Sequence, residues 1–310
     1  MKNFKLYTLF AACLIGATAF AQQTPRFSNY LFNKVIINPA AAGSNEYMEV
    51  MGSYRKQWVG FDGAPATSFL SFDGSVLQRR LGVGVQVIND RIGALNSTGA
   101  VITAAPRVRL ARESFLSFGV SLGMFNNKLQ GSELTYKDAS ETAIPGANEN
   151  VSILDMKAGL YFKNRHYFAG VSAFNIFEPV LEYSGNQQSQ GSTLERHYYF
   201  MGGRIFSLNE AWDLVPSLQY KLSEQGQDQL DINLRAMYNN FIGLGVSVRG
   251  KESVSIMMEL IPTPVFRFGY AYDLSTNSLR NEHSGSHEIM VAYRFIQNKN
   301  LTENPRFLFN

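Results

Sequence analysis

The sequence predicts an all-β fold: a transmembrane antiparallel β-barrel of about fourteen strands with both termini in the periplasm. Three observations predict this fold. Apolar residues recur at every second position from residue 46 onward, which is the period of a strand. The predicted strands average about 10 residues, near the ~9–11 needed to cross a bilayer at a tilt. The connections alternate between short and long, as in outer-membrane barrels.

The composition agrees with a β-rich membrane protein. The 310 residues are 45% hydrophobic, 13% aromatic and only 17% charged, whereas a typical soluble domain carries about 25% charged residues. The net charge of +3 is close to balanced, so no basic face for nucleic acid is expected. Many aromatic residues and few charges favour strands over helices.

The N-terminus has the pattern of a secretory signal peptide. Lys2 and Lys5 precede an apolar run over 6–20, which ends in Ala19-Phe20-Ala21. We expect cleavage after Ala21 and export to the cell outer membrane. The only cysteine, Cys13, lies inside this segment, so disulfides and thiol catalysis are not expected in the mature chain. No other window offers ~18 consecutive apolar residues, which excludes a transmembrane helix bundle.

The barrel strands are predicted, in chain order, at 46–58, 66–77, 81–89, 98–110, 114–126, 152–163, 166–177, 197–207, 212–222, 229–238, 241–249, 253–261, 265–273 and 287–295. Connections after even-numbered strands are tight. Those after odd-numbered strands are mostly longer, over 59–65, 90–97, 127–151, 178–196, 223–228 and 274–286, with 250–252 short. We expect the tight turns in the periplasm and the long loops outside the cell.

Alternation within the strands separates a lipid face from a lumen face. Leu230, Ile232 and Leu234 alternate with Asp231 and Asn233 in one of the clearest examples. Glycines inside strands, such as those of Gly82-x-Gly84, fall on the lumen face, where they relieve crowding or permit bending. Aromatic residues near strand ends resemble interface girdles: Tyr161, Phe162, Tyr167, Phe168, Tyr198, Tyr199, Phe200, Tyr270 and Tyr272. Pro106 and Pro216 must lie at a bulge or a strand end.

The domain organisation that follows has four parts: a signal peptide over 1–21, an N-terminal periplasmic or lumen segment over 22–45, the barrel over 46–295, and a C-terminal periplasmic tail over 296–310.

The search for reaction chemistry gives little. His283 and His287 are four apart, which places them ~13 Å apart on a strand and makes a shared metal improbable. No P-loop or EF-hand pattern occurs, and the one G-x-S-x-G match, Gly119 to Gly123, lies inside the predicted strand 114–126 and not at a strand-to-helix turn. We therefore expect no enzyme activity, no cofactor and no metal, and keep a serine hydrolase on the barrel rim only as a weak alternative.

Segment 55–67 is the most distinctive part of the sequence. It forms the first external loop with its flanking strand ends. Gly60, Gly63 and Pro65 are residues that shape a fixed turn, while Trp58 and Phe61 are large aromatic side chains. Two interpretations stay open: a rigid aromatic platform for another protein, or a structured hairpin with no partner.

A set of motifs resembles the PorP/SprF family over essentially the whole mature chain. They are Asn38-Pro39-Ala40 to Gly43, then Arg55-x-Gln57-Trp58-x-Gly60-Phe61-x-Gly63-Ala64-Pro65-x-Thr67, Leu81-Gly82-x-Gly84, Asn89-Asp90-x-Ile92-Gly93, Ser286-His287-Glu288-Ile289 and the closing Tyr293-x-Phe295.

The resemblance implies an outer-membrane barrel of the type IX secretion system. Such proteins are tied to secretion of large surface proteins and, in gliding bacteria, to display of mobile adhesins. The implied partners are a secreted surface protein with a C-terminal sorting domain, other secretion components and outer-membrane lipid. The loops 127–151, 178–196 and 274–286 are expected to hold the surface protein. The motif positions serve as candidates for fold and partner contacts: Asn38, Pro39, Gly43, Arg55, Gln57, Trp58, Gly60, Phe61, Gly63, Pro65, Asn89, Asp90, His287 and Glu288.

The alternative function is a passive or substrate-selective pore. Fourteen strands enclose a lumen wide enough to conduct if it is empty. Arg235, Arg249, Asp231 and Lys157 would then be lumen charges that set selectivity.

Overall fold

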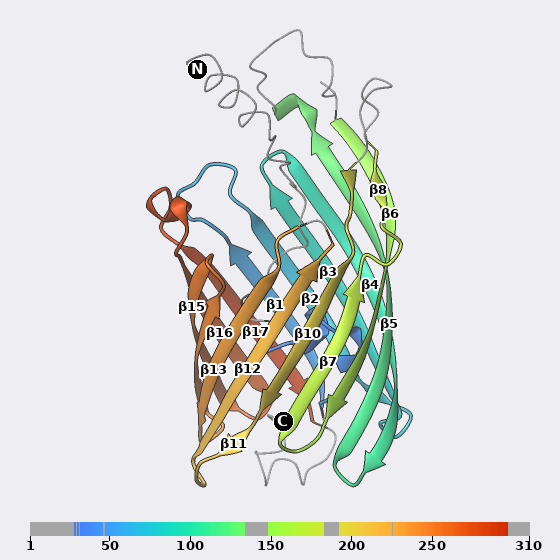
Figure 1. The fold of residues 1–310 in the computed structure, drawn as a ribbon, viewed down its shortest axis with the longest axis vertical. Helices are drawn as coiled ribbons and strands as arrows, with labels where there is room; N and C mark the ends of the chain where they lie inside the picture. The colour runs from blue at the N-terminus through green and yellow to red at the C-terminus, as the bar shows by residue number, and fades with distance from the viewer. Residues whose placement is uncertain are drawn as a thin grey trace, which may run out of the picture.

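A computed structural model describes residues 28, 30, 32–45, 47–133, 148–182, 192–224 and 226–296. Fourteen antiparallel strands close into one barrel (Figure 1). Neighbours in the chain are neighbours in the sheet, and the barrel closes where the first strand pairs with the last, Met48 opposite Phe295. The strand number and order predicted from alternation are therefore confirmed.

The barrel strands are β1 (Met48–Lys56), β2 (Ala66–Val76), β3 (Leu81–Ile92), β4 (Leu95–Ala111), β5 (Ser114–Gln130), β6 (Asn148–Lys163), β7 (Tyr167–Phe174), β10 (His197–Arg204), β12 (Trp212–Ser223), β13 (Gln229–Tyr238), β14 (Ile242–Arg249), β15 (Ser253–Thr263), β16 (Phe266–Ser275) and β17 (Ser286–Phe295). The short β11 (Phe206–Ser207) continues β10, and β8 (Val180–Leu181) pairs with β9 (Ser192–Thr193) outside the barrel sheet. The described residues also contain the short 3-10 helices η2 (Lys34–Ile36), η3 (Pro39–Ala41), η4 (Gly131–Glu133) and η5 (Ser278–Asn281).

Two predicted long connections are wrong in extent. Residues 90–97 form no long loop, because β3 runs to Ile92, β4 begins at Leu95 and only two residues turn between them. The Asn89 side chain donates to Asn96 Oδ1 at 2.9 Å, across this pair of strands. Likewise β5 continues to Gln130, and β6 begins at Asn148. These strand ends are polar, so the alternation that marks a membrane strand is lost before the hydrogen-bonded ladder ends.

The two ends of the barrel differ. One end, here called the turn end, carries the short connections 77–80, 112–113, 164–166, 208–211, 239–241 and 264–265. The other end, the loop end, carries 57–65 and 276–285 together with the two short turns 93–94 and 250–252. Since β1 starts and β17 finishes at the turn end, both ends of the barrel sheet lie there (Figure 1).

The outer and inner faces of the wall separate as predicted. Leu122, Ile232 and Ile289 are among the apolar side chains that are at least half-exposed on the outside. Asp231, Asn233 and Glu288 from the same wall are buried on the inside. An apolar outer band and a polar interior are what a bilayer requires of a barrel.

The predicted aromatic girdle is only partly correct. Tyr167 and Tyr270 are exposed on the outside, but Tyr161, Phe168 and Tyr199 are buried and point inward. Alternation places every second residue of an aromatic run in the lumen, so adjacent aromatic residues cannot all meet lipid. Outward aromatic pairs that the sequence did not single out gather at the turn end: Trp212–Tyr238 at 4.8 Å and Phe266–Tyr293 at 5.2 Å between ring centroids.

The two prolines lie inside strands, not at the bulge or strand end predicted. The β4–β5 ladder skips Pro106 between the pairs made by Ala104 and Arg107 and resumes in the same register. Pro216 lies just beyond the last β10–β12 pair, Gly203 with Ser217. On its other side each proline stays paired, Pro106 with Leu81 and Pro216 with Leu234.

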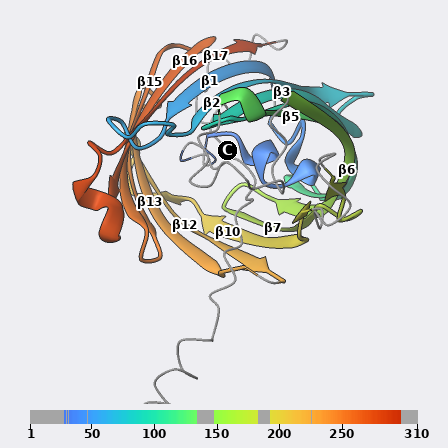
Figure 2. The same cartoon turned by 90° about the horizontal axis from the view of Figure 1, so that it is seen from above.

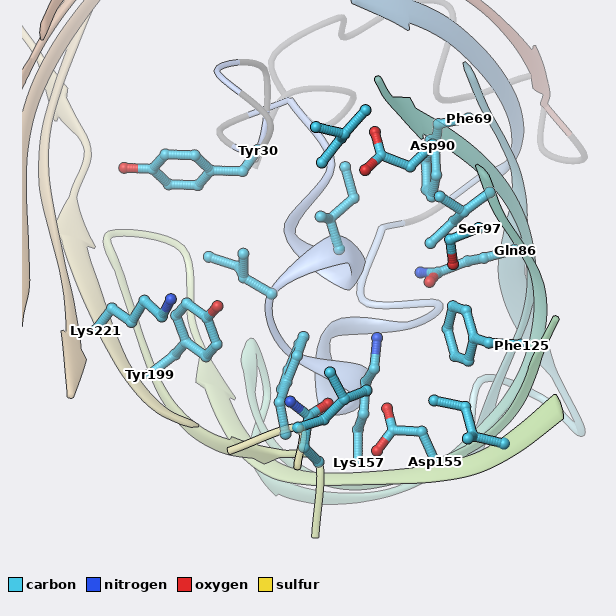
Figure 3. A pocket seen from close by; sticks show the side chains of 18 of the residues that line it. Tyr30, Phe69, Gln86, Asp90, Ser97, Phe125, Asp155, Lys157, Tyr199 and Lys221 are labelled. Carbon is cyan, nitrogen blue, oxygen red and sulfur yellow. The ribbon is translucent and has the colours of Figure 1, made fainter. Parts of the chain in front are cut away.

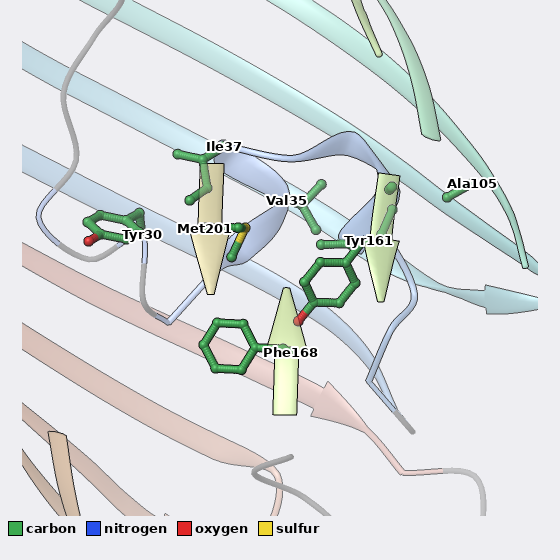
Figure 4. Close-up of a cluster of buried hydrophobic side chains, with 10 residues drawn as sticks. Tyr30, Val35, Ile37, Ala105, Tyr161, Phe168 and Met201 are labelled. Atoms are coloured by element: carbon green, nitrogen blue, oxygen red, sulfur yellow. The ribbon is translucent and has the colours of Figure 1, made fainter. Parts of the chain in front are cut away.

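The described part of the N-terminal segment, residues 28, 30 and 32–45, lies inside the barrel (Figure 2). Figure 2 shows this blue segment within the ring of strands. Its apolar side chains pack on the inner wall in a cluster that includes Tyr30, Val35, Ile37, Tyr161 and Phe168 (Figure 4). We call residues 28–45 the plug.

Candidate functional site

The plug takes its shape from two asparagine caps. Asn33 and Asn38 are extended, and their side chains accept hydrogen bonds from the backbone N–H groups of Val35 and Ala40. Each cap opens one turn of 3-10 helix, and Pro39 fits the first helical position because it has no N–H to satisfy. The motif Asn38-Pro39-Ala40 is therefore a local folding signal inside the lumen.

Glycines on the wall let the plug approach closely. We call Gly82, Gly119, Gly159 and Gly170 the docking glycines. They come from β3, β5, β6 and β7, and a Cβ on any of them would overlap the plug. Gly82 faces the Ala42 carbonyl, Gly119 faces the Ala40 backbone, and Gly159 and Gly170 both face the Asn38 side chain. The prediction that Gly82 relieves crowding on the lumen face is confirmed.

Gly43 closes the plug with a conformation that favours glycine. Its φ is +61°, and an added Cβ would overlap the Gly74 carbonyl and the backbone of Gly82. The Gly43 N–H donates to Asp73 Oδ2 at 3.1 Å. The chain can then turn at the turn end and rise into β1.

Hydrogen bonds hold the plug to most of the wall. The Asn38 Nδ2 group donates to the carbonyls of Leu160 and Val171, at 2.9 and 3.3 Å. Further wall side chains bond the plug backbone or its polar groups: Ser172 Oγ to Ile37 O at 2.6 Å, Arg267 to Phe32 O at 2.8 Å, Gln86 to Val35 O at 3.3 Å, and Asn233 to Tyr30 Oη at 2.7 Å. Buried plug polar groups thus find partners in the wall, as burial requires.

The plug residue Lys34 is a cation that lies near two arginine side chains of the wall. The ammonium of Lys34 lies 4.4 Å from the centre of the Phe168 ring. Burial, with the nearby guanidinium groups of Arg235 and Arg267, lowers the pKa of Lys34 to about 8. Part of the Lys34 population is therefore neutral near pH 8, which relieves repulsion in the plug.

A buried ion cluster fixes the plug at the loop end. Arg55 Nη2 lies 2.6 Å from Asp273 Oδ2, and Arg55 Nη1 lies 3.3 Å from Glu288 Oε2. Ser28 of the plug joins them: its N–H donates to Glu288 at 2.8 Å and its Oγ donates to Asp273 at 2.7 Å. We call these four residues the loop-end ion cluster. Two of the candidate residues, Arg55 and Glu288, are thus buried and paired with each other inside the barrel.

A second set of ion pairs lines the same side of the wall. Glu49 pairs with Arg267 and Arg294, at 3.3 and 3.1 Å, and Glu259 pairs with Arg235 and Arg267. On the neighbouring strands Arg249 pairs with Asp231 at 3.3 Å. The charges proposed to set pore selectivity are therefore inside the lumen, but Arg235, Arg249 and Asp231 are engaged with each other or with neighbours.

The first loop is a rigid structure bound to its neighbours. Val59 exchanges backbone hydrogen bonds with Ser284 and Gly285, both at 2.8 Å, and the Trp58 N–H donates to Ser286 Oγ. We call residues 57–65 and 283–286 the loop platform. Its left-handed residues are Trp58, Gly60, Gly63 and Gly285.

Aromatic side chains gather on the loop platform. The Trp58 ring packs edge-on against Phe61, with centroids 6.4 Å apart, and lies 6.1 Å from the His283 ring. Phe61 is 47% exposed, so much of its ring faces solvent. Gln57 and Pro65 close the loop base through a 2.9 Å backbone hydrogen bond.

The remaining candidate residues are separated by the wall. Asp90 points inward and accepts a 2.6 Å hydrogen bond from Thr67, whereas Asn89 points outward. His287 also points outward, where its Nδ1 lies 2.6 Å from the Tyr270 hydroxyl. The candidates thus occupy five places: the plug, the loop-end ion cluster, the loop platform, the outer wall and, for Asp90, the inner wall.

Sequence reasoning missed several residues of this interior. Asp273 and Ser28 complete the loop-end ion cluster, and Asn127 and Gln219 are buried polar groups of the lumen wall. The inward parity of Asp273 and Gln219 was readable from the alternation, whereas Ser28 precedes the strands and Asn127 falls in a predicted loop. Alternation does not show which inward residues contact one another across the lumen, because that depends on the tertiary structure.

Within the described residues, no helix is long and apolar enough to span a membrane. In the same part of the chain, no cluster of three or more histidine, cysteine or acidic side chains could hold a metal ion.

Comparison with solved structures returns other barrels at low identity. The translocator domain of the autotransporter NalP from Neisseria meningitidis is 12% identical, with a TM-score of 0.47, covering 90% of this chain and 100% of that one. A FadL homologue from Pseudomonas aeruginosa is 10% identical, with a TM-score of 0.47 and coverage of 91% and 97%. Omp33 from Acinetobacter baumannii is 9% identical, with a TM-score of 0.46 and coverage of 82% and 100%.

No curated protein matches the chain. A protein family does: the family described as type IX secretion system membrane protein PorP/SprF matches residues 19–293, which is most of the sequence. The fold and this family together place the protein in the outer membrane. The chain belongs to the PorP/SprF family of type IX secretion membrane proteins.

Proposed function

We propose that this barrel binds a secreted surface protein at its loop end and supports that protein's secretion or display, by docking and without turnover. The observation that carries the proposal is the plug. Its η3 part packs against β3, β5, β6 and β7 inside the lumen, and we take the loop end as the surface available to a cell-surface partner. The loop platform supplies rigid aromatic groups there.

The experiment that tests this function is a pull-down of the tagged barrel from gently solubilised outer membranes, followed by mass spectrometry. We expect a large secreted protein with a C-terminal sorting domain to co-purify near one to one. A barrel that is recovered alone at low and moderate salt would contradict the proposal.

Phe61 is expected to anchor the partner. Replacing Phe61 with alanine should weaken partner retention at least about tenfold, because exposed aromatic anchors dominate interface energies. The barrel itself should fold normally, since Phe61 is nearly half-exposed. Partner retention in the pull-down measures the effect. The matched control is Leu77→Ala, an exposed apolar residue of the turn end; equal loss in both variants would contradict the assignment.

The turn end is proposed to meet other secretion components. The exposed residues Arg80, Arg109, Arg112 and Arg165 form what we call the basic arc: Arg109 lies near the end of β4, and the other three lie on turns between β2 and β7. The turns 208–211, 239–241 and 264–265 of the opposite side carry no lysine or arginine. A one-sided positive field of this kind attracts and orients an acidic protein face.

Charge reversal tests this second surface. The triple variant R80E/R112E/R165E should lose salt-sensitive co-purification of secretion components, while its folding stays within ~0.5 kcal/mol because the three residues are exposed. The control K251E/R280E reverses exposed charges at the loop end. Unchanged recovery of those components at low salt would remove the basic arc from the proposal.

A further inference from the structure

A cavity of about 220 Å³ lies in the lumen on the loop side of the plug (Figure 3). The plug residues Tyr30, Ile36 and Ile37 form one boundary. At the loop end the cavity reaches Ile92 and Leu95, which flank the 93–94 turn. We call this space the loop-end cavity. Because Ile36 and Ile37 of the plug lie on its turn side, a ligand would enter it from the loop end.

The charges of the loop-end cavity balance. Its acidic residues are Asp90, Asp155 and Asp231, and its basic residues are Lys157, Lys221 and Arg249. Arg249 and Asp231 pair with each other, and Asp90 accepts from Thr67. A balanced lining gives no net field to concentrate a polyanion or a free metal ion. The chemistry therefore favours an electrically neutral ligand.

Within the part of the chain that the structure describes, three polar atoms of the cavity wall lack a hydrogen-bond partner. They are Asn127 Nδ2, Asp155 Oδ1 and Gln219 Oε1, each on a side chain more than nine-tenths buried. One is a donor and two are acceptors, and they come from the separate strands β5, β6 and β12. Buried polar groups without partners are costly, so a ligand that supplies both acceptors and donors gains affinity here.

The rest of the wall is mainly apolar. Phe69, Ile88, Phe125, Ile153, Phe174 and Leu181 line it together with the plug isoleucines. A backbone with apolar side chains satisfies such a lining better than a sugar, whose hydroxyl groups need more polar partners than this wall offers. The volume lies below the ~300–1,000 Å³ of usual ligand pockets, so it admits a chain end or a tight turn of chain and excludes a folded domain.

We infer that the loop-end cavity receives a short segment of the secreted partner's polypeptide, inserted from the loop end. This inference rests on the proposed function, because it assigns a second contact to the same partner. The loop platform then holds the partner's folded surface, while Asn127, Asp155 and Gln219 bond the inserted backbone.

Photocrosslinking inside the complex tests the insertion. We would place p-benzoylphenylalanine at Phe125 in the cavity, at Phe61 on the loop platform and, as a lipid-facing control, at Phe268. The barrel is then irradiated in cells, and the crosslinked peptides are sequenced. We expect Phe125 and Phe61 to crosslink to the same co-purifying partner, with Phe125 reaching a single short segment, and Phe268 to give no partner crosslink.

The other outcomes separate the two proposals. Crosslinking from Phe61 but not from Phe125 overturns the insertion and leaves the docking function standing. A crosslink from Phe125 to residues of this same chain shows that the barrel fills its own cavity, and it also overturns the insertion. A partner absent from all three samples and from the pull-down contradicts the proposed function itself.

A second variant keeps the inference testable without a crosslinker. N127L/Q219L removes two polar groups that lack partners in the barrel alone, so thermal stability should hold or rise while partner retention falls about tenfold. The control is Ser247→Ala, which also removes a buried hydroxyl without a partner but does not line the cavity. Retention equal to that of the control would overturn the assignment.

Discussion

The double variant G82A/G119A is expected to displace the plug and to turn a closed barrel into a conducting one. A Cβ on Gly82 would overlap the Ala42 carbonyl, and a Cβ on Gly119 would overlap the Ala40 backbone. Backbone atoms cannot rotate away as a side chain can, and overpacking of this kind costs about 1–3 kcal/mol per site. Single-channel recording in planar bilayers should show steady open currents for the variant and little or none for the unaltered protein.

Gly84→Ala is the matched control for this experiment. Gly84 faces the lumen from the same strand as Gly82, but a Cβ there meets its nearest neighbour, Thr103 Cβ, at an ordinary 3.4 Å. This variant should stay closed. If G82A/G119A retains its heat-modifiable mobility on gels and remains as silent as Gly84→Ala, the docking glycines do not hold the plug. Open currents in the unaltered protein would support the pore alternative.

The second large effect is expected at Arg55. Replacing Arg55 with alanine leaves Asp273 and Glu288 buried beside each other without their shared cation. Removing one partner of a buried ion pair costs about 3–5 kcal/mol, because the remaining charge loses its pairing cation. Arg249 stays near Asp273 and offsets part of this cost. We expect the temperature of heat-modifiable unfolding to fall markedly, as gel mobility or circular dichroism would record. The same variant should loosen Ser28, which bonds both carboxylates.

Two comparisons make the Arg55 result specific. Arg112→Ala removes an exposed arginine of the turn end and should change stability by less than ~0.5 kcal/mol. The triple variant R55A/D273N/E288Q removes the whole charge set, and it should recover much of the lost stability because no unpaired charge remains. A triple variant as unstable as Arg55→Ala would show that the charges themselves are not the cause.

The barrel could be predicted because the alternation of apolar and polar residues is a local property of each strand. A strand between lipid and lumen must alternate apolar and polar residues, so odd or even position alone separates Ile232 from Asp231. Counting the alternating segments gave the number of strands. The same rule failed at Asn89 and Asn96, where β3 and β4 continue beyond the apolar band with polar residues on both faces. Hydrogen bonding continued there without an alternating pattern, and the sequence was misread as a loop.

The candidate site was less predictable because its contacts cross the lumen. The motif around Asn38 could be recognised, but its function depends on four glycines on four different strands. Arg55 and Glu288 lie far apart in the chain and meet only because β1 pairs with β17. Neighbouring His287 faces lipid instead, so membership of one motif did not imply membership of one site.

The position of Ser28 has a consequence for the order of assembly. Its partners Asp273 and Glu288 belong to β16 and β17, the last two strands to be synthesised. The plug itself precedes β1, the strand with which β17 must pair to close the barrel. The plug contacts the inner wall along its length, so it could not easily enter a barrel that had already closed. We therefore expect the β16–β17 hairpin to pair with β1 only after the plug lies inside the lumen. Closure of the barrel and binding of the plug would then occur in one folding step.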